Sequence, residues 1–574
     1  MDEPQSPEPS PADASSAENA LAPAEPAADY PISTGKGVKE TIESILIAFI
    51  LAFVFRAFVV EAFVIPTGSM ATTLLGAHMR FTCKECGYTF DANYPSRSNG
   101  NEDIEIPLRA GQERELQGRP RTFAIYCPNC RHKVSRDEAT NPFVRYGDRI
   151  LVLKYLYIPW ISSPHRWDVV VFKTPTDRPA YAINYIKRLI GLPGEELMIL
   201  DGDVYVKMGN AWQIQTKPKF AQDALWRIIY DNDYRPLNQN RSDGWTLPWV
   251  HNDGDGWDTG NAEDARVIVF NNKDGGGRLR FDPTRDPRYN PQSAPGGYFT
   301  DWLAYDATMG QDLSRYASGD SFASEGDYMV YTVSDLKLQF FYDRKAGDGP
   351  LMARMTKLNH EFVLTFTPDA VRLKHTHGGD LPAEIPPLHA FVTSKARGPI
   401  KVEFSNVDYQ VSVRLNGELI FQTTPQQYHP DVKDLLARHE RRRESRTPFG
   451  EPSVTIDAAR QQALLSHVSL WRDVYYTPED ANGRELVHGR PRDPVKLGGD
   501  DYFVMGDNSA ASYDARFWTD EIHLPDEGLN VESGRVPGRF MLGRAFFVYW
   551  PAGYRPFERA PALVPDFGDM RLIH

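Results

Sequence analysis

The feature that most constrains this chain is the uninterrupted apolar run from Ser44 to Phe55. A helix that spans a bilayer needs about 20 mostly apolar residues. The run reaches that length, ending at Ile65, only if the side chains of Arg56 and Glu61 extend toward lipid headgroups at one interface. The alternative is a buried helix of a soluble domain. We predict a single transmembrane helix over 41–65, because no second segment of this kind follows.

The residues before this run predict a disordered acidic tail over 1–40. Residues 1–35 contain no Lys or Arg and are rich in Pro, Ala, Ser, Asp and Glu. Such a composition buries too little apolar surface to offset the entropy lost on folding. It also lacks the basic start of a cleavable signal peptide. Lys36 and Lys39 lie beside the apolar run and favour a cytoplasmic N-terminus.

The composition of the whole chain predicts several folded domains. The 574 residues are 25% charged and 41% hydrophobic, as in globular proteins. The net charge is -13 and the isoelectric point is near 5.6. We therefore expect no nucleic-acid partner, since such proteins present basic surfaces.

The only four cysteines form two Cys-x-x-Cys pairs. Two such pairs present four thiolates to one tetrahedral ion, so Cys83, Cys86, Cys127 and Cys130 predict a structural zinc site in a zinc-ribbon-like insertion over 81–141. Four thiolates leave no open position for a catalytic water. The rival interpretation is a pair of disulfides, which an oxidising compartment would favour.

Most of the remaining chain has the pattern of β-strands, and the predicted fold class is mainly β. Residues 146–154 and 166–173 are β-branched, aromatic runs bounded by Gly, Asp and Pro. Alternating apolar residues recur between 211 and 435, with Asn416-Gly417 between two such runs as a hairpin turn. We predict a β-sandwich-like insertion over 211–435, a charged helical linker over 436–464 and a C-terminal tail over 556–574.

Three short blocks carry candidate chemistry. They are Pro66-Thr67-Gly68-Ser69-Met70, the stretch from Tyr185 to Glu195 around Lys187, and the stretch from Met505 to Trp518. In content and order they resemble the motifs of type I signal peptidases, membrane-bound serine proteases with a Ser/Lys dyad. The resemblance covers 42–80, 142–210 and 465–555. It implies an antiparallel β catalytic core built from 66–80 with 142–210 and from 465–555.

The resemblance also implies the roles of single residues. Ser69 matches the nucleophile and Lys187 the general base. Thr67 matches a residue whose hydroxyl helps form the oxyanion hole, with the backbone N–H of Ser69 as second donor. Ser512 matches the serine that orients the lysine amine, and Asp514 with Arg516 matches a pair that braces the site.

Two further residues match the first turn of the third block, and one position departs from it. Gly506 and Asp507 match that turn. Many family members then read Gly-Asp-Asn-Arg-Asp-Asn-Ser, whereas this chain has Ser509-Ala510-Ala511-Ser512 after Gly506-Asp507-Asn508, so a role for Ser509 stays open.

A lysine can serve as the base only as a neutral amine. Its ordinary pKa of about 10.4 leaves little of that form at neutral pH, and burial among apolar side chains lowers the pKa. The neighbours of Lys187 suit this requirement, because Tyr185, Ile186, Leu189 and Ile190 can enclose the amine. A serine hydroxyl next to such an amine becomes a usable nucleophile.

These features predict a membrane-anchored serine endopeptidase that removes signal peptides from exported preproteins after small residues. Its partners would be preproteins and membrane lipid, and catalysis would need no cofactor. It would cross the cell membrane once, with the catalytic domain on the extracytoplasmic side. Two alternatives stay open: a self-cleaving Ser/Lys protease of the phage-repressor type, and a non-catalytic module whose zinc ribbon and β-sandwich bind partners.

Overall fold

The structure is a computed structural model that divides into two compact units, Met1–Ala57 and Phe58–His574. It describes residues 34–94, 109, 125–135, 137–138, 142–154, 157, 162–174, 183–236, 238, 241, 243–260, 266–289, 297–308, 331–377, 388–391, 398–445, 451–478, 485–524, 529–553 and 564–573. The chain is mainly β, as predicted.

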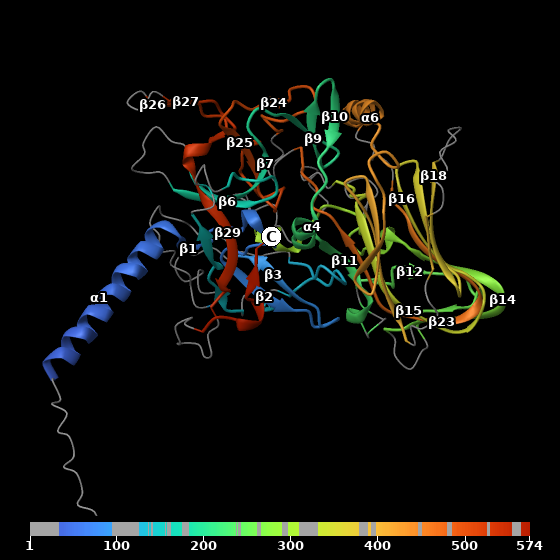
Figure 1. Cartoon of the computed structure of the whole chain (residues 1–574). Coiled ribbons are helices and arrows are strands. Elements are labelled where there is room, and N and C mark those ends of the chain that lie inside the picture. Colours follow the sequence, from blue (N-terminus) through green and yellow to red (C-terminus); the bar gives the residue numbers. More distant parts are fainter. Residues whose placement is uncertain are drawn as a thin grey trace, which may run out of the picture. The chain divides into compact units, whose positions relative to one another are not determined.

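The N-terminal unit contains the helix α1, Thr34–Phe58 (Figure 1). Among the residues that the structure describes, no helix has the length and apolar character needed to span a bilayer. The expected boundaries were wrong at both ends. The helix begins inside the segment expected to be disordered, and it ends at Phe58 instead of continuing to Ile65.

The strand β1 explains why the helix ends there. Residues Val60–Val64, which include the β-branched or aromatic Val60, Phe63 and Val64, form β1, and β1 pairs antiparallel with β5, Arg149–Leu153. Such residues favour a strand once a partner strand satisfies their backbone groups. The segment before Ser69 is therefore part of a sheet of the second unit.

The central sheet of the second unit is antiparallel, with the strand order β1-β5-β29-β6-β7-β25-β28 and β30 added beside β29. The further strands are β6 (Val169–Lys173), β7 (Asn184–Gly191), β25 (Asp501–Met505), β28 (Val536–Pro537), β29 (Met541–Trp550) and β30 (Arg571–Leu572). The sheet therefore joins the beginning, the middle and the end of the unit. Segment 556–574 was expected to be a separate tail, but β30 belongs to this sheet and Ile573 is buried.

A smaller sheet has the order β10-β9-β8-β24. Its strands are β8 (Glu196–Leu200), β9 (Asp203–Met208), β10 (Ala211–Ile214) and β24 (Val495–Lys496). Asp201 and Gly202 connect β8 to β9 with φ angles of 51° and 83°. Positive φ at both residues is typical of the two-residue turns that match strand twist, and β8 and β9 form an antiparallel hairpin.

The largest sheet has 13 strands and forms what we call the β insert, residues 227–472. Its strands are β11 (Arg227–Asp231), β12 (Trp249–Val250), β13 (Trp257–Asp258), β14 (Ile268–Phe281), β15 (Leu336–Gly347), β16 (Leu351–Lys357), β17 (His360–Phe366), β18 (Ala370–His377), β19 (Leu388–Phe391), β20 (Ile400–Val407), β21 (Gln410–Leu415), β22 (Glu418–Gln422) and β23 (Val454–Arg472). Apolar side chains of its strands, including Phe340, Phe362 and Phe404, bury one common core.

The long strand β23 organises the β insert and corrects the predicted helical linker. It pairs with β14 and β16 near its start and with β15 and β11 toward its end (Figure 1). Residues 436–464 were expected to be helical, yet the helix α6 covers Val432–Ser445 and β23 begins at Val454. Because β23 has partners on both edges, backbone pairing outweighs the helical preference of Ala, Gln and Leu in this stretch. The expected hairpin turn at Asn416-Gly417 joins β21 to β22.

Smaller elements complete the unit. A three-stranded sheet contains β2 (His78–Thr82), β3 (Thr89–Asn93) and β4 (Val144–Arg145), and a two-stranded sheet contains β26 (Ile522–Leu524) and β27 (Leu529–Val531). The helix α4 covers Lys219–Leu225. Short 3₁₀ turns lie at Gly68–Met70 (η1), Asn232–Tyr234 (η4), Pro283–Arg285 (η5), Ala304–Thr308 (η6), Gly538–Phe540 (η8) and Phe567–Asp569 (η9).

Candidate active site

Ser69 and Lys187 lie together in the buried part of the second unit. Ser69 is in the turn η1, and Lys187 is in the middle of β7. Lys187 Nζ is 2.6 Å from Ser69 Oγ in a buried hydrogen bond, although 118 positions separate the residues in sequence. The exposed fractions are 8% for Ser69 and 5% for Lys187. The structure therefore brings together the two residues that sequence analysis paired.

Burial changes the protonation of Lys187 in the expected direction. Loss of solvent lowers the pKa of the Lys187 amine to about 8, while the nearby carboxylates of Asp514 and Asp507 act to raise it and Arg516 acts to lower it. The amine lies 5.6 Å from the centre of the Tyr185 ring. A substantial fraction of the amine is thus neutral at mildly alkaline pH, the state that can accept a proton from a hydroxyl.

Thr67 precedes η1, the turn that carries the candidate nucleophile Ser69 (the nucleophile turn), and is exposed. Its Oγ1 lies 3.5 Å from Ser69 Oγ, at the outer limit of a hydrogen bond. The hydroxyl therefore lies close to the atom where an attacked carbonyl would bind.

The expected support residues form a buried hydrogen-bonded network. Arg516 donates from Nε to Asp514 Oδ1 and from Nη2 to Oδ2, each at 2.8 Å. Asp514 Oδ2 also accepts the backbone N–H of Gly506 at 2.8 Å. Asp514 and Arg516 are both fully buried, so the pair fixes the loop that begins at Gly506.

Gly506 allows this loop to lie against the nucleophile turn. A Cβ at this position would lie 2.3 Å from Ser512 Oγ and 2.4 Å from the carbonyl oxygen of Ser69. Ser512 is buried, and its Oγ has no hydrogen-bond partner in the part of the chain that the structure describes. The orienting bond from Ser512 to Lys187 that the resemblance implies is thus not made in this structure.

Three functional contacts were missed by sequence analysis. Arg188, the residue after Lys187, donates from Nε and Nη2 to the two oxygens of Asp507, each at 2.7 Å. Ser509 Oγ accepts hydrogen bonds from Arg516 Nη1 and from the backbone N–H of Thr477, each at 2.8 Å. For the contact between Arg188 and Asp507, the only indication in the sequence was that Arg188 directly follows Lys187. No sequence signal indicated a role for Ser509.

The third missed contact involves Asn508. Its backbone N–H donates to Ser69 O at 3.1 Å, and its Nδ2 donates to Gly68 O at 3.1 Å. The same Nδ2 donates to Asp306 Oδ1 at 2.6 Å. Asn508 therefore holds the backbone of the nucleophile turn and connects that turn to the β insert.

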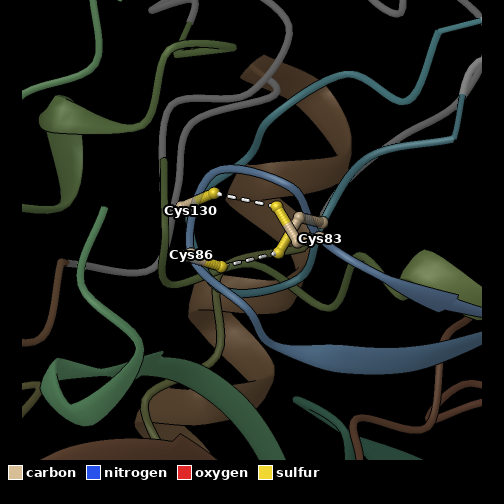
Figure 2. Close-up of side chains that lie close together, drawn as sticks. Cys83, Cys86 and Cys130 are labelled. Atoms are coloured by element: carbon tan, nitrogen blue, oxygen red, sulfur yellow. Dashed lines mark hydrogen bonds between the residues drawn. The ribbon is translucent and has the colours of Figure 1, made fainter. Parts of the chain in front are cut away.

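The four cysteines form a second cluster of chemically active groups. Figure 2 shows the labelled Cys83, Cys86 and Cys130 side chains directed toward one another. The sulfurs of Cys83 and Cys130 are 3.6 Å apart, as are those of Cys86 and Cys127, and all four thiols are free. Four sulfurs at the zinc–sulfur distance of a tetrahedral site lie about 3.8 Å apart. The cluster therefore has the dimensions of a four-cysteine metal site.

The backbone around the cysteines has the same form in both pairs. The residues after each pair, Gly87 and Arg131, have φ angles of 76° and 58°. Their N–H groups donate to Cys83 O and Cys127 O at 2.8 Å and 3.0 Å. Two equivalent tight turns thus present the four sulfurs to one point. The arrangement fits a metal ion better than two disulfides, since a disulfide needs sulfurs about 2.05 Å apart.

Comparison with known proteins links parts of this chain to one family. Residues 131–248 and 455–550 match the model of the signal peptidase, peptidase S26, family. These segments contain Lys187, Ser512, Asp514 and Arg516, whereas Ser69 lies before them.

Individual relatives and solved structures also match parts of this chain. Signal peptidase I of Rickettsia typhi is 27% identical over 192 residues, which is 33% of this chain and 52% of that protein. Signal peptidase I of Rickettsia massiliae is 27% identical over 174 residues, or 30% of this chain and 45% of that protein. The chain thus spans about half the length of the curated relatives it matches. The carbohydrate binding module CBM66 from Bacillus subtilis matches 39% of this chain and 94% of its own, at 9% identity and a TM-score of 0.19. Residues 131–248 and 455–550 of this chain are therefore similar to the signal peptidases of the peptidase S26 family.

Proposed function

We propose that this protein is a serine endopeptidase that removes signal peptides from exported preproteins by a Ser69/Lys187 dyad. The observation that carries the proposal is the buried hydrogen bond of 2.6 Å between Lys187 Nζ and Ser69 Oγ. Supporting it are the lowered pKa of the amine and the family of the matched segments. A solvated lysine beside a serine would lack the neutral form that this chemistry needs.

The reaction proceeds in two halves. Neutral Lys187 takes the proton of the Ser69 hydroxyl as Oγ attacks the carbonyl carbon of the scissile peptide bond. The tetrahedral intermediate collapses as the Lys187 ammonium gives that proton to the departing amine nitrogen, which leaves an ester on Ser69. Water then attacks the ester, again with neutral Lys187 as base, and the acid product and free Ser69 are released.

The oxyanion of each tetrahedral intermediate needs hydrogen-bond donors. We assign this role to Thr67 Oγ1 and the backbone N–H of Ser69, because the Thr67 hydroxyl lies 3.5 Å from Ser69 Oγ. One such donor changes kcat by about 10²–10³-fold in other serine proteases.

The surroundings of Ser69 support a preference for short apolar side chains before the scissile bond. Ile65, Met70, Leu74 and Ile186 belong to one buried apolar cluster next to the dyad. Small side chains are those found before signal-peptide cleavage sites.

The test of the main proposal is cleavage of a preprotein by the full chain and by Ser69→Ala and Lys187→Ala variants. Both variants should lose cleavage while keeping the unfolding temperature of the parent protein. Full activity in either variant would rule out the dyad. Cleavage of the chain itself without any preprotein would favour a self-cleaving protease, and no cleavage by the parent protein would favour a non-catalytic module.

Attachment to the cell membrane through α1, with the catalytic unit on the extracytoplasmic side, is the finer part of the proposal. Large apolar side chains of α1 are exposed by 48–68%, including Leu46, Leu51 and Phe53. An apolar surface of this extent needs a cover, and lipid acyl chains provide one. The full chain should float with phosphatidylglycerol-containing vesicles, whereas an Ile47→Lys/Leu51→Lys variant should stay in the soluble fraction. Equal flotation of both proteins would contradict attachment through α1.

The four-cysteine cluster is assigned to a structural zinc ion. Cys83, Cys86, Cys127 and Cys130 would hold it, and it would crosslink the two turns without taking part in the reaction. The free sulfurs at 3.6 Å and the matching turns support this assignment.

A further inference from the structure

The β insert reaches into the active site through one short turn. The 3₁₀ turn η6, Ala304–Thr308, carries Asp306, which is 8% exposed. Asp306 Oδ1 accepts the Asn508 Nδ2 hydrogen bond at 2.6 Å. Asn508 in turn donates to the backbone oxygens of Gly68 and Ser69. Two hydrogen bonds therefore separate the insert from the nucleophile.

A second contact from the same turn supports this connection. Tyr305 is 1% exposed and packs in an apolar cluster with Ala71 and Leu75, which follow the nucleophile turn. From β11, Arg227 Nη2 donates to Ala71 O at 3.3 Å. The nucleophile turn is thus held by the insert on its backbone and on its apolar side.

We propose that Asp306 is a positioning residue of the protease, which holds Asn508 and, through Asn508, the turn that carries Ser69. This inference rests on the proposed Ser69/Lys187 dyad. The β insert then completes the active site. Neither of the segments that match the peptidase family contains Asp306.

The geometry of Asn508 explains why it needs a partner. Its Nδ2 has two hydrogens, and the structure gives it two acceptors, Gly68 O and Asp306 Oδ1. Without the carboxylate the amide could rotate and release Gly68 O, because one buried donor would lack an acceptor. Ser69 Oγ would then move relative to Lys187 Nζ, and small displacements of reacting groups reduce the rate strongly.

The protonation of Asp306 should also change the stability of the protein with pH, which can be measured without an activity assay. Burial raises the pKa of its carboxyl to about 7, against the hydrogen bond from Asn508. Asp301 also acts to raise it, Arg472 and Arg227 act to lower it, and Tyr305 is adjacent. The folded-state pKa exceeds the unfolded value near 3.8, so the stabilisation is complete below about pH 4 and is lost as the pH rises to about 7.

The test compares Asp306→Ala, Asp306→Asn and Asn508→Ala in the full chain, with a preprotein-derived peptide as substrate. Asp306→Ala should lower kcat about 10- to 100-fold and change KM less than about threefold. Asp306→Asn should keep kcat within about threefold, because its amide oxygen still accepts from Asn508. It should also flatten the dependence of unfolding on pH between about 4 and 7. Asn508→Ala should lose at least as much kcat as Asp306→Ala, and the double variant should lose no more than Asn508→Ala alone.

The matched control is Asp457→Ala, another buried acid of the β insert. Asp457 pairs with Arg278 and Arg354, both within the β insert. This variant should lower the unfolding temperature and leave kcat within about twofold, which separates positioning from general stability of the insert.

Two outcomes would overturn the inference. The first is parental kcat in Asp306→Ala, or in Asn508→Ala if the former does not fold, while Ser69→Ala is inactive. The second is an equal loss of kcat in Asp457→Ala. Activity of Ser69→Ala would instead reject the proposed dyad itself, so the two failures are distinguishable.

Discussion

The guanidinium of Arg188 and the carboxylate of Asp507 form a two-bond ion pair in which both side chains are 0% exposed. Arg188 Nη1 also donates to Trp167 O at 2.7 Å. The pair joins β7, directly after Lys187, to the loop that follows β25. It therefore fixes the distance between the candidate base and the loop that contacts Ser69.

We predict that Asp507→Asn destabilises the catalytic unit by about 3–5 kcal/mol, because a buried guanidinium would lose its counter-charge. Denaturant-induced unfolding measures the effect. Asp493→Asn is the matched control, since Asp493 forms an exposed pair with Arg490 at 3.3 Å and should contribute less than about 1 kcal/mol. Equal unfolding midpoints for the two variants would contradict this account of the buried pair.

Cleavage should depend on pH through Lys187. The pKa of its amine is lowered to about 8, so kcat/KM should rise about tenfold per pH unit below pH 8 and level off above it. A plateau that begins near pH 6 or near pH 10 would be inconsistent with Lys187 as the base.

The lowered pKa of Lys187 also predicts that replacing this residue removes activity without lowering stability. The folded-state pKa of Lys187 lies below its ordinary value of 10.5, so the folded chain binds fewer protons than the unfolded chain between about pH 8 and 10.5. The charged amine therefore destabilises the fold below about pH 8. Lys187→Met should abolish cleavage without lowering the free energy of unfolding at pH 7. A marked loss of stability in this variant would show that the amine is well solvated or paired.

Gly506→Ala should inactivate the enzyme through sterics alone. The added methyl group would lie 2.3 Å from Ser512 Oγ and 2.4 Å from Ser69 O, and the second neighbour is backbone that cannot move aside cheaply. We expect kcat to fall by at least about 100-fold. Gly499→Ala is the control, because a Cβ there meets nothing within 4 Å. Similar kcat values for the two variants would show that the loop does not lie against the nucleophile turn.

Metal analysis should find about one zinc ion per chain, and any of the four Cys→Ser substitutions should abolish it. Removal of the ion by a chelator should lower the unfolding temperature, since the ion joins two turns that are separated in sequence. His132→Ala is the control, because His132 adjoins the second pair without being a ligand. Two disulfides and no zinc after purification under air-free conditions would reject the metal site.

Sequence analysis predicted the parts of the site that lie in short local blocks. Ser69, Lys187, Asp514 and Arg516 stand in such blocks, and the structure brings them together. Asp306 could not be predicted, because it lies 202 positions from Asn508 in a stretch without periodic pattern, and only the tertiary fold makes the contact.

In the fold, too, elements set by their own residues could be predicted from the sequence, whereas elements set by distant strands could not. The turns at Asp201-Gly202 and Asn416-Gly417 follow from the conformational freedom of these residues, and both are present. By contrast, β23 contains residues with helical preference and becomes a strand because partners flank both of its edges. The end of α1 at Phe58 likewise depends on β5, a strand almost 100 residues later in the chain.

The bond from Asn508 to Gly68 spans 440 positions of the chain, which has a consequence for biosynthesis. At about 5–20 residues per second, the ribosome needs roughly 20–90 s to make the segment between them. During that interval the nascent chain carries Ser69 without the loop that holds it. The proposed protease can therefore become active only after the segment that contains Asn508 has been made and has folded against Gly68.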